Sequence, residues 1–180
     1  VYKRQVLDLP LTSKADVLDL GTGSGALALA LASERKGWRI TGTDVSIDAL
    51  KVAEFNKEYH RLNNVEFIKS FWFEEFEKKS FGQSKFDLIV TNPPYIGEDD
   101  PHLDKGDLKY EPNVALVAAE DGKANLETII FSSVTFLRDQ GWLLVEHGFD
   151  QALTVRKFFG EAGFKKCQTV KDLNNHDRVT

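Results

Sequence analysis

Two short stretches of this chain carry residue types that can do chemistry, and the first is TNPPY at residues 91–95. Pro93 and Pro94 lack a backbone N–H, so the turn exposes carbonyl oxygens that only accept hydrogen bonds. Asn92 adds a side-chain oxygen and Tyr95 adds an aromatic face. This set suits a planar NH2 group, which donates to the Asn92 oxygen and the Pro93 carbonyl while the ring lies against its plane. The competing interpretation is a rigid proline turn capped by an asparagine.

The second stretch is a glycine turn, GTGSG, at residues 21–25. Glycine permits a sharp turn and lets the backbone approach a ligand closely. A strand before such a turn and a helix after it aim free backbone N–H groups at a bound nucleotide. Gly21, Gly23 and Ala26 match the G-x-G-x-x-G/A pattern of NAD enzymes. The tighter G-x-G-x-G spacing of residues 21–25, with Asp19 just before it, fits S-adenosylmethionine enzymes instead. A third interpretation is a turn that only packs a helix on a sheet.

An acid and an aromatic residue extend this second stretch. Asp44 follows the expected second strand, where a carboxylate is placed to accept hydrogen bonds from ribose hydroxyls. The alternative for Asp44 is a favourable charge at a helix N-terminus. Trp72 follows the expected third strand, at the edge where α/β proteins bind ligands, although spacing alone favours an ordinary core aromatic.

The elements that must position these residues alternate between short apolar runs and helical patterns. Strands are expected at residues 17–20, 38–43, 65–68, 86–90 and 142–145, and helices at residues 26–32, 46–59, 126–137 and 153–159. Residues 164–170 and 178–180 are expected to form an antiparallel pair, whereas residues 1–5 show no usable pattern. This alternation indicates an α/β domain with a mostly parallel sheet.

Composition and charge exclude several classes of protein. The chain has 180 residues, of which 42% are hydrophobic and 28% charged, as in an ordinary globular domain. No apolar run has the length of a membrane span, and the single cysteine, Cys167, fits a reducing cytoplasm. The formal net charge is -5 without a dense basic cluster, which disfavours a nucleic-acid partner. No metal is expected, because the histidines lie away from metal-ligand spacing: His60, His102, His147 and His176.

The motifs taken together resemble a known family. VLDLGTGSG, TGTD and TNPPY look like the class I S-adenosylmethionine-dependent methyltransferases that act on amide or amino nitrogens. NPPY is shared by amino-group DNA methyltransferases and protein glutamine methyltransferases, so it does not separate the two. Residues 95–122, 144–148 and 175–180 resemble the peptide chain release factor glutamine N5-methyltransferases, the HemK/PrmC family. The resemblance is collinear and covers nearly all of the chain after residue 16.

This resemblance implies a fold, a cofactor and a set of site residues. The fold is a Rossmann-like class I methyltransferase, a mostly parallel seven-stranded sheet with helices on both faces and an antiparallel C-terminal edge strand, here truncated. The cofactor is S-adenosyl-L-methionine, and the residues that bind it are Gly21, Thr22, Gly23, Ser24, Gly25, Asp44, Trp72 and Asn92. The acceptor glutamine is held by Asn92, Pro93, Pro94 and Tyr95, among which Asn92, Pro93 and Tyr95 have the catalytic roles.

The sequence departs from the family in two respects. Phe71 stands where relatives often have an aspartate near the adenine amino group, which puts one adenine hydrogen bond in doubt. The family also has an N-terminal helical domain that helps to dock the release factor. Residues 1–180 are therefore expected to be the catalytic domain, a fragment without that docking domain. We expect a cytoplasmic monomer whose partner is a release factor, with no direct nucleic-acid contact and no membrane contact.

Three other functions stay open on the sequence alone. An NAD-dependent oxidoreductase fits the glycine turn, but NPPY argues against it. An adenine-amino nucleic-acid methyltransferase fits NPPY, but the acidic charge and residues 100–112 argue against it. A non-catalytic binding module on a decayed enzyme fold is disfavoured because residues 21–25, Asp44 and Asn92 are intact.

Overall fold

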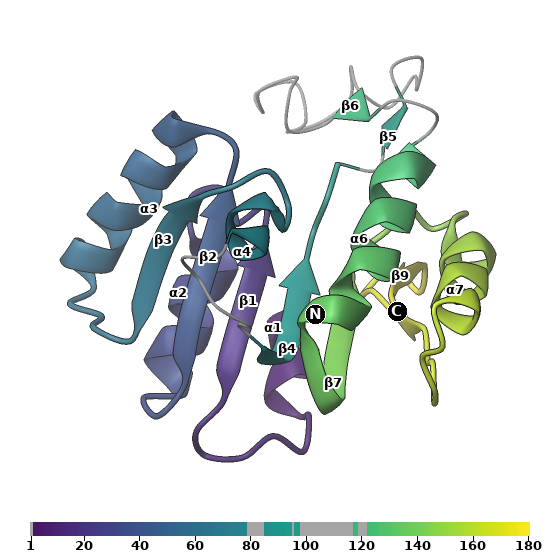
Figure 1. The fold of residues 1–180 in the computed structure, drawn as a ribbon, viewed down its shortest axis with the longest axis horizontal. Helices are drawn as coiled ribbons and strands as arrows, with labels where there is room; N and C mark the ends of the chain where they lie inside the picture. Colours follow the sequence, from purple (N-terminus) through teal and green to yellow (C-terminus); the bar gives the residue numbers. More distant parts are fainter. Residues whose placement is uncertain (1, 79–84, 95, 98–116, 119–121) are drawn as a thin grey trace. The chain divides into compact units, whose positions relative to one another are not determined.

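A computed structural model describes residues 2–78, 85–94, 96–97, 117–118 and 122–180. The chain forms two compact units. Unit 1 comprises Val1–Thr91 and Ser132–Leu144, and unit 2 comprises Asn92–Phe131 and Val145–Thr180. The helix α6 (Lys123–Phe136) and the strand β7 (Leu137–Val145) contribute residues to both units (Figure 1).

Unit 1 is built around a five-stranded sheet with the strand order β3-β2-β1-β4-β7. Its other strands are β1 (Asp16–Leu20), β2 (Arg39–Asp44), β3 (Val65–Lys69) and β4 (Phe86–Thr91). The pairs β1–β2, β1–β4 and β2–β3 are parallel. The carboxyl ends of β1, β2, β3 and β4 therefore meet at one edge of the sheet, and the turns that follow them share that edge.

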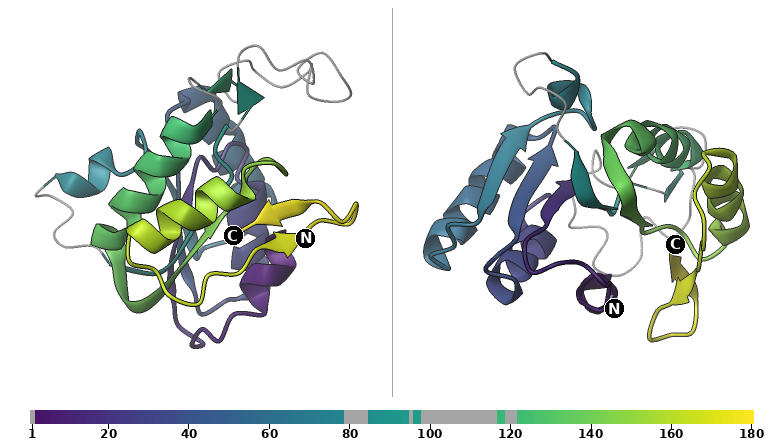
Figure 2. Two further views of the ribbon diagram at one scale, coloured as in Figure 1. Left: turned by 90° about the vertical axis from the view of Figure 1, so that its right-hand side faces the viewer. Right: turned by 60° about the horizontal axis from the view of Figure 1, so that its bottom comes forward.

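The helices of unit 1 cover the sheet because its central strands are apolar on both faces. Val17, Leu18 and Leu20 of β1 are completely buried, as expected for a parallel strand with helices above and below. The helices are α1 (Tyr2–Leu7), α2 (Ala26–Glu34), α3 (Ile47–Tyr59) and α4 (Glu74–Glu77). In Figure 2, α2 and α3 lie on one side of the strands and the short α4 lies on the other. None of the described helices has the length and apolar character needed to cross a membrane.

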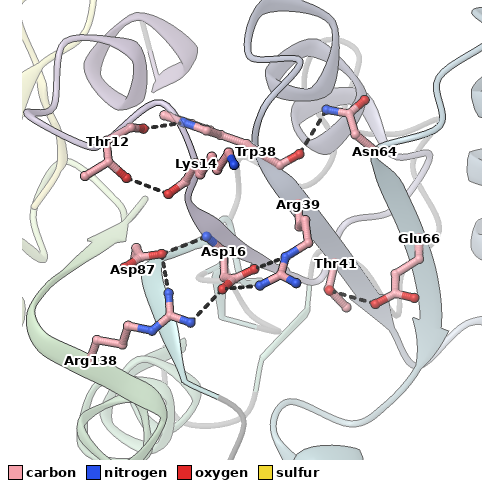
Figure 3. A network of polar contacts seen from close by, with 10 residues as sticks. All are labelled: Thr12, Lys14, Asp16, Trp38, Arg39, Thr41, Asn64, Glu66, Asp87 and Arg138. Atoms are coloured by element: carbon pink, nitrogen blue, oxygen red, sulfur yellow. Dashed lines mark hydrogen bonds and ion pairs between the residues drawn. The ribbon is translucent and has the colours of Figure 1, made fainter.

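A charged network joins the amino ends of the strands in unit 1 (Figure 3). The Asp16 carboxylate accepts hydrogen bonds from Arg39 Nε and from Arg138 Nη2, each at 2.6 Å. Asp87 accepts from the Asp16 backbone N–H at 2.7 Å and also pairs with Arg138. The Arg39 guanidinium is the main cause of the lowered pKa of Asp16, with a further contribution from Arg138. Because Arg138 is the second residue of β7, these contacts fix the start of β7 beside the start of β4.

Unit 2 contains α7 (Ala152–Glu161) and two small strand pairs. β5 (Ile96–Gly97) and β6 (Val117–Ala118) are parallel, whereas β8 (Val170–Lys171) and β9 (Asp177–Val179) are antiparallel. The chain end also bonds to the end of β7, because Val145 and Thr180 exchange two backbone hydrogen bonds of 2.8 and 3.0 Å. The expected antiparallel C-terminal strand is therefore present.

The α/β class and the order of the elements are confirmed, with differences in detail. The main sheet has five strands in the described part of the chain, where seven were expected. Residues 164–169 do not form the expected strand: the Phe164 N–H donates to the Phe159 carbonyl at 3.0 Å, and the rings of these residues lie 5.1 Å apart. These contacts hold the segment against the end of α7. At the other end of the chain, residues without a visible pattern form α1.

Candidate functional site

The glycine turn at the carboxyl end of β1 has a backbone that side chains rarely adopt. Gly23 and Gly25 have φ values of +56° and +80°, in the left-handed region. A Cβ on Gly25 would lie 2.8 Å from the ring of Phe67, so this position also requires glycine for packing. A Cβ on Gly23 would meet nothing within 4 Å. The turn is thus packed on its inner side at Gly25 and open at Gly23, where a ligand can approach the backbone.

Hydrogen bonds from the neighbouring strands hold the turn in this shape. The Thr22 N–H donates to the Thr43 carbonyl of β2 at 2.8 Å, and the Thr22 hydroxyl donates to Asp19 Oδ2 at 2.7 Å. Asp19 is only 3% exposed. The pKa of Asp19 is raised to about 7, mainly by burial and to a smaller extent by the nearby Asp44 charge, against the opposing effect of hydrogen bonds from Thr22 and the Ala28 backbone. A carboxyl group that titrates near neutral pH therefore lies directly beneath the turn.

Asp44, at the end of β2, joins the turn to the helix that follows. Its Oδ2 accepts from the Gly23 N–H at 2.9 Å and its Oδ1 accepts from the Ser46 N–H at 2.8 Å. Ser46 in turn caps α3, accepting from the Ala49 N–H at 3.2 Å. Each carboxylate oxygen has a second lone pair, so Asp44 retains capacity to accept hydrogen bonds from ribose hydroxyls. The helix-terminus and ribose interpretations of Asp44 are therefore compatible.

Trp72 lies beside the same turn and is not enclosed in the core. It is half-buried, and its ring is 3.7 Å from the position that a Cβ on Gly21 would take. Its backbone has φ +44°, which is uncommon for a non-glycine residue. Ser70 supports this conformation, because its hydroxyl donates to the Trp72 carbonyl at 3.0 Å while its N–H donates to the Asp44 carbonyl at 3.0 Å. The neighbouring Phe71 ring is half exposed, with its centroid 5.6 Å from that of Trp72.

The TNPPY stretch begins at the end of β4, next to β1 in the sheet. Leu20 and Thr91 are partners in the β1–β4 register, and the buried Thr91 hydroxyl donates to the Leu20 carbonyl at 2.9 Å. Gly21 and Asn92 are therefore the next residues after two paired positions. Asn92 is exposed and Pro93 is buried.

The structure thus brings together one part of the expected site within unit 1, namely residues 21–25, Asp44 and Trp72. Asn92, Pro93 and the half-buried Pro94 belong to unit 2. Tyr95 lies outside the described residues, so its role stays a prediction. Among the described residues, no group of three or more histidine, cysteine, aspartate or glutamate side chains is arranged to hold a metal ion.

One residue beside this site, Tyr2, was not predicted from the sequence. Its hydroxyl accepts from the Thr91 N–H at 2.8 Å, directly before Asn92. A single tyrosine in a short segment without apolar periodicity carries no signal that a sequence pattern can register.

Comparison with known proteins identifies similar chains over almost the full length. The family described as "Methyltransferase domain" matches residues 11–175. A release factor glutamine methyltransferase of Shewanella oneidensis is 47% identical over 180 residues, which are 100% of this chain and 61% of the relative. The protein of the same name from Vibrio cholerae is 44% identical over 174 residues, 97% of this chain and 59% of the relative. The resemblance inferred from the motifs is confirmed, and the chain spans about three fifths of the length of these curated relatives.

Solved structures show the same fold at lower identity. A methyltransferase from Pyrococcus furiosus has a TM-score of 0.68 at 18% identity, covering 99% of this chain and 80% of the other. The ribosomal protein L11 methylase from Lactobacillus delbrueckii subsp. bulgaricus has a TM-score of 0.66 at 19% identity, covering 98% and 70%. At these identities the likeness concerns the fold alone, and it agrees with the sheet order of unit 1.

Proposed function

Because the chain belongs to the family of methyltransferase domains, we propose that it methylates the side-chain amide nitrogen, N5, of a glutamine in a peptide chain release factor. The methyl donor is S-adenosyl-L-methionine. The observation that carries the proposal is the collinear 47% identity to a release factor glutamine methyltransferase over all 180 residues. Residues 1–180 are then the catalytic domain of a cytoplasmic monomer whose partner is the release factor, without direct contact to nucleic acid or membrane.

The turn after β1 has the features that this donor requires. The open backbone at Gly23 and the half-buried Trp72 ring fit a ligand with a flat base and a chain that lies along the turn. In this assignment Gly21, Thr22, Gly23, Ser24 and Gly25 hold the methionine part, Asp44 binds the ribose hydroxyls, and Trp72 lines the adenosine pocket. The donor supplies a methyl group on a sulfonium, which is a good leaving group, and its positive charge favours a site that contains the Asp44 carboxylate.

The acceptor side follows from the chemistry of an amide. A glutamine amide nitrogen is a poor nucleophile because its lone pair is delocalised into the carbonyl, so the site must hold it close to the methyl group and aligned with it. Asn92 and the Pro93 carbonyl accept the two N–H groups, while Pro94 and Tyr95 bound the pocket around the amide plane. These hydrogen bonds strengthen as positive charge develops on nitrogen, which stabilises the transition state. After the N–C bond forms, one N–H proton leaves to water.

The proposal is tested by following labelled methyl from S-adenosylmethionine with mass spectrometry of the products. Three acceptors are offered to the chain: a release factor, the same factor with its glycine-flanked glutamine changed to alanine, and DNA. We expect label on the first factor only, at the glutamine side chain. Label on DNA supports the adenine-amino alternative, and label that persists on the alanine variant means that the acceptor is a different residue.

A further inference from the structure

The hydroxyl of Tyr2 takes part in the backbone hydrogen bonding of two strands. It accepts from the Thr91 N–H at 2.8 Å, and it lies 2.9 Å from the Thr91 carbonyl and 2.7 Å from the Leu144 carbonyl. Thr91 ends β4 and Leu144 is near the end of β7. A phenolic hydroxyl has one proton, so it donates to one of these carbonyls at a time or divides the proton between them. Tyr2 thus connects β4 and β7 at their carboxyl ends.

The opposite side of Thr91 is held as well. Its side-chain hydroxyl donates to the Leu20 carbonyl of β1 at 2.9 Å, and Thr91 is completely buried. Thr91 is therefore fixed through its side chain toward β1 and through its backbone toward Tyr2. The next residue is Asn92, whose Cα position follows from the backbone of Thr91, because the intervening peptide bond is planar.

We propose that Tyr2 is a positioning residue for methyl transfer, acting through the backbone of Thr91 on the placement of Asn92. The inference rests on the proposed function and adds to it a residue from the segment that precedes the first strand. Transfer to a weak amide nucleophile depends on alignment, and a displacement of about 1 Å in such a site lowers the rate by up to about a hundredfold. Without the hydroxyl, the Thr91 N–H loses its partner and the end of β4 gains freedom.

The test compares Tyr2→Phe with the unchanged chain. Phenylalanine retains the ring and removes only the hydroxyl. We expect the turnover number to fall by about tenfold, with the dissociation constant for S-adenosylmethionine changed by less than about twofold, because the glycine turn is not altered. Hydrogen exchange measured by NMR should be faster at the Thr91 amide. Lys3→Ala is the matched control from the same helix, since Lys3 pairs with the exposed Glu34 at 2.9 Å, away from Thr91, and it should leave all three quantities unchanged.

A double-mutant cycle separates positioning from general loosening. Thr91→Val removes the hydroxyl that bonds to Leu20, and we expect its effect on turnover to be non-additive with that of Tyr2→Phe, since both act on one backbone segment. Additive losses, or a lower turnover that only parallels weaker cofactor binding, would overturn the proposal. So would unchanged turnover and unchanged Thr91 exchange in Tyr2→Phe. If the unchanged chain methylates none of the offered acceptors, the proposed function fails, whereas an active chain indifferent to Tyr2→Phe refutes the positioning role alone.

Discussion

Asp19 offers a quantitative test of the electrostatics beneath the glycine turn. Its carboxyl group is buried and accepts hydrogen bonds from the Thr22 hydroxyl and the Ala28 backbone N–H, and its pKa is raised to about 7 from an ordinary value of 3.8. The folded chain therefore keeps a proton that the unfolded chain loses near pH 4. The free energy of unfolding should fall as the pH rises from about 4 to about 7, and this contribution should level off above that range.

The size of the effect follows from the two pKa values. One pKa unit corresponds to about 1.4 kcal/mol, so the ionised carboxylate of Asp19 lowers the free energy of unfolding by about 4 kcal/mol above pH 7. Asp19→Asn removes the titration and keeps an oxygen that can accept from the Thr22 hydroxyl, but it buries an NH2 group at a cost of about 1.5 kcal/mol. We expect the variant to be about 1.5 kcal/mol less stable than the unchanged chain at pH 4 and about 2.5 kcal/mol more stable at pH 8.

The measurement is urea unfolding of both proteins, followed by tryptophan fluorescence between pH 4 and pH 8 and expressed as the difference in free energy of unfolding. Carboxylates other than Asp19 cancel in this difference. Ser33→Ala, at an exposed position on α2, changes no titratable group, so it is the control and should show a difference that does not vary with pH. A similarly flat difference for Asp19→Asn would refute the reasoning, because it would mean that the carboxyl group is ionised in the folded chain throughout this range.

Three further outcomes are expected. Isothermal titration should show that the chain binds S-adenosylmethionine and does not bind NAD; tight binding of NAD without binding of S-adenosylmethionine would contradict the cofactor assignment. Asp44→Ala should weaken the binding of S-adenosylmethionine by about 1–3 kcal/mol, as when a charged hydrogen-bonding partner is lost. Asn92→Ala should lower the turnover number far more than cofactor affinity in steady-state assays, and equal effects on both would place Asn92 in ground-state binding. Gly25→Ala should lower the free energy of unfolding by about 2 kcal/mol or more in thermal unfolding, because the added Cβ would meet Phe67 at 2.8 Å and the residue has φ +80°. The control is Gly160→Ala in α7, where nothing lies within 4 Å of the added Cβ; this variant should be neutral or stabilising in the same measurement.

The parts of the fold that could be predicted are those whose signal is local. The strand β1, the glycine turn and α2 are contiguous, and their apolar runs and glycine spacing define them without reference to the remainder of the chain. The same holds for Asp44 and Asn92, because each follows an apolar strand directly. The order of the strands in the sheet is not local and was not predicted, although the family resemblance implied a mostly parallel sheet.

The features that could not be predicted depend on contacts between distant residues. Tyr2 and Leu144 are separated by 142 positions, and their hydrogen bond depends on how β4 and β7 end. The half-buried position of Trp72 depends on its place beside Gly21, where a Cβ would lie 3.7 Å from the Trp72 ring, and spacing along the chain does not encode this neighbourhood. Residues 164–170 are a different case: they were expected to form a strand, but the Phe164 ring packs against Phe159 at the end of α7, and this contact prevails over local strand propensity.

The charged network of Asp16, Arg39, Asp87 and Arg138 bears on how this sequence can diverge among lineages. A strand of five residues is roughly 17 Å long, which exceeds the Debye length of about 8 Å at physiological ionic strength. A change at the exposed guanidinium groups of this network, Arg39 and Arg138, therefore has little effect on the potential around the glycine turn. Natural selection can exchange the ion pairs of one edge, for instance during adaptation to a new growth temperature, while the residues of the other edge stay constant. The two ends of the same strands are thus free to evolve at different rates.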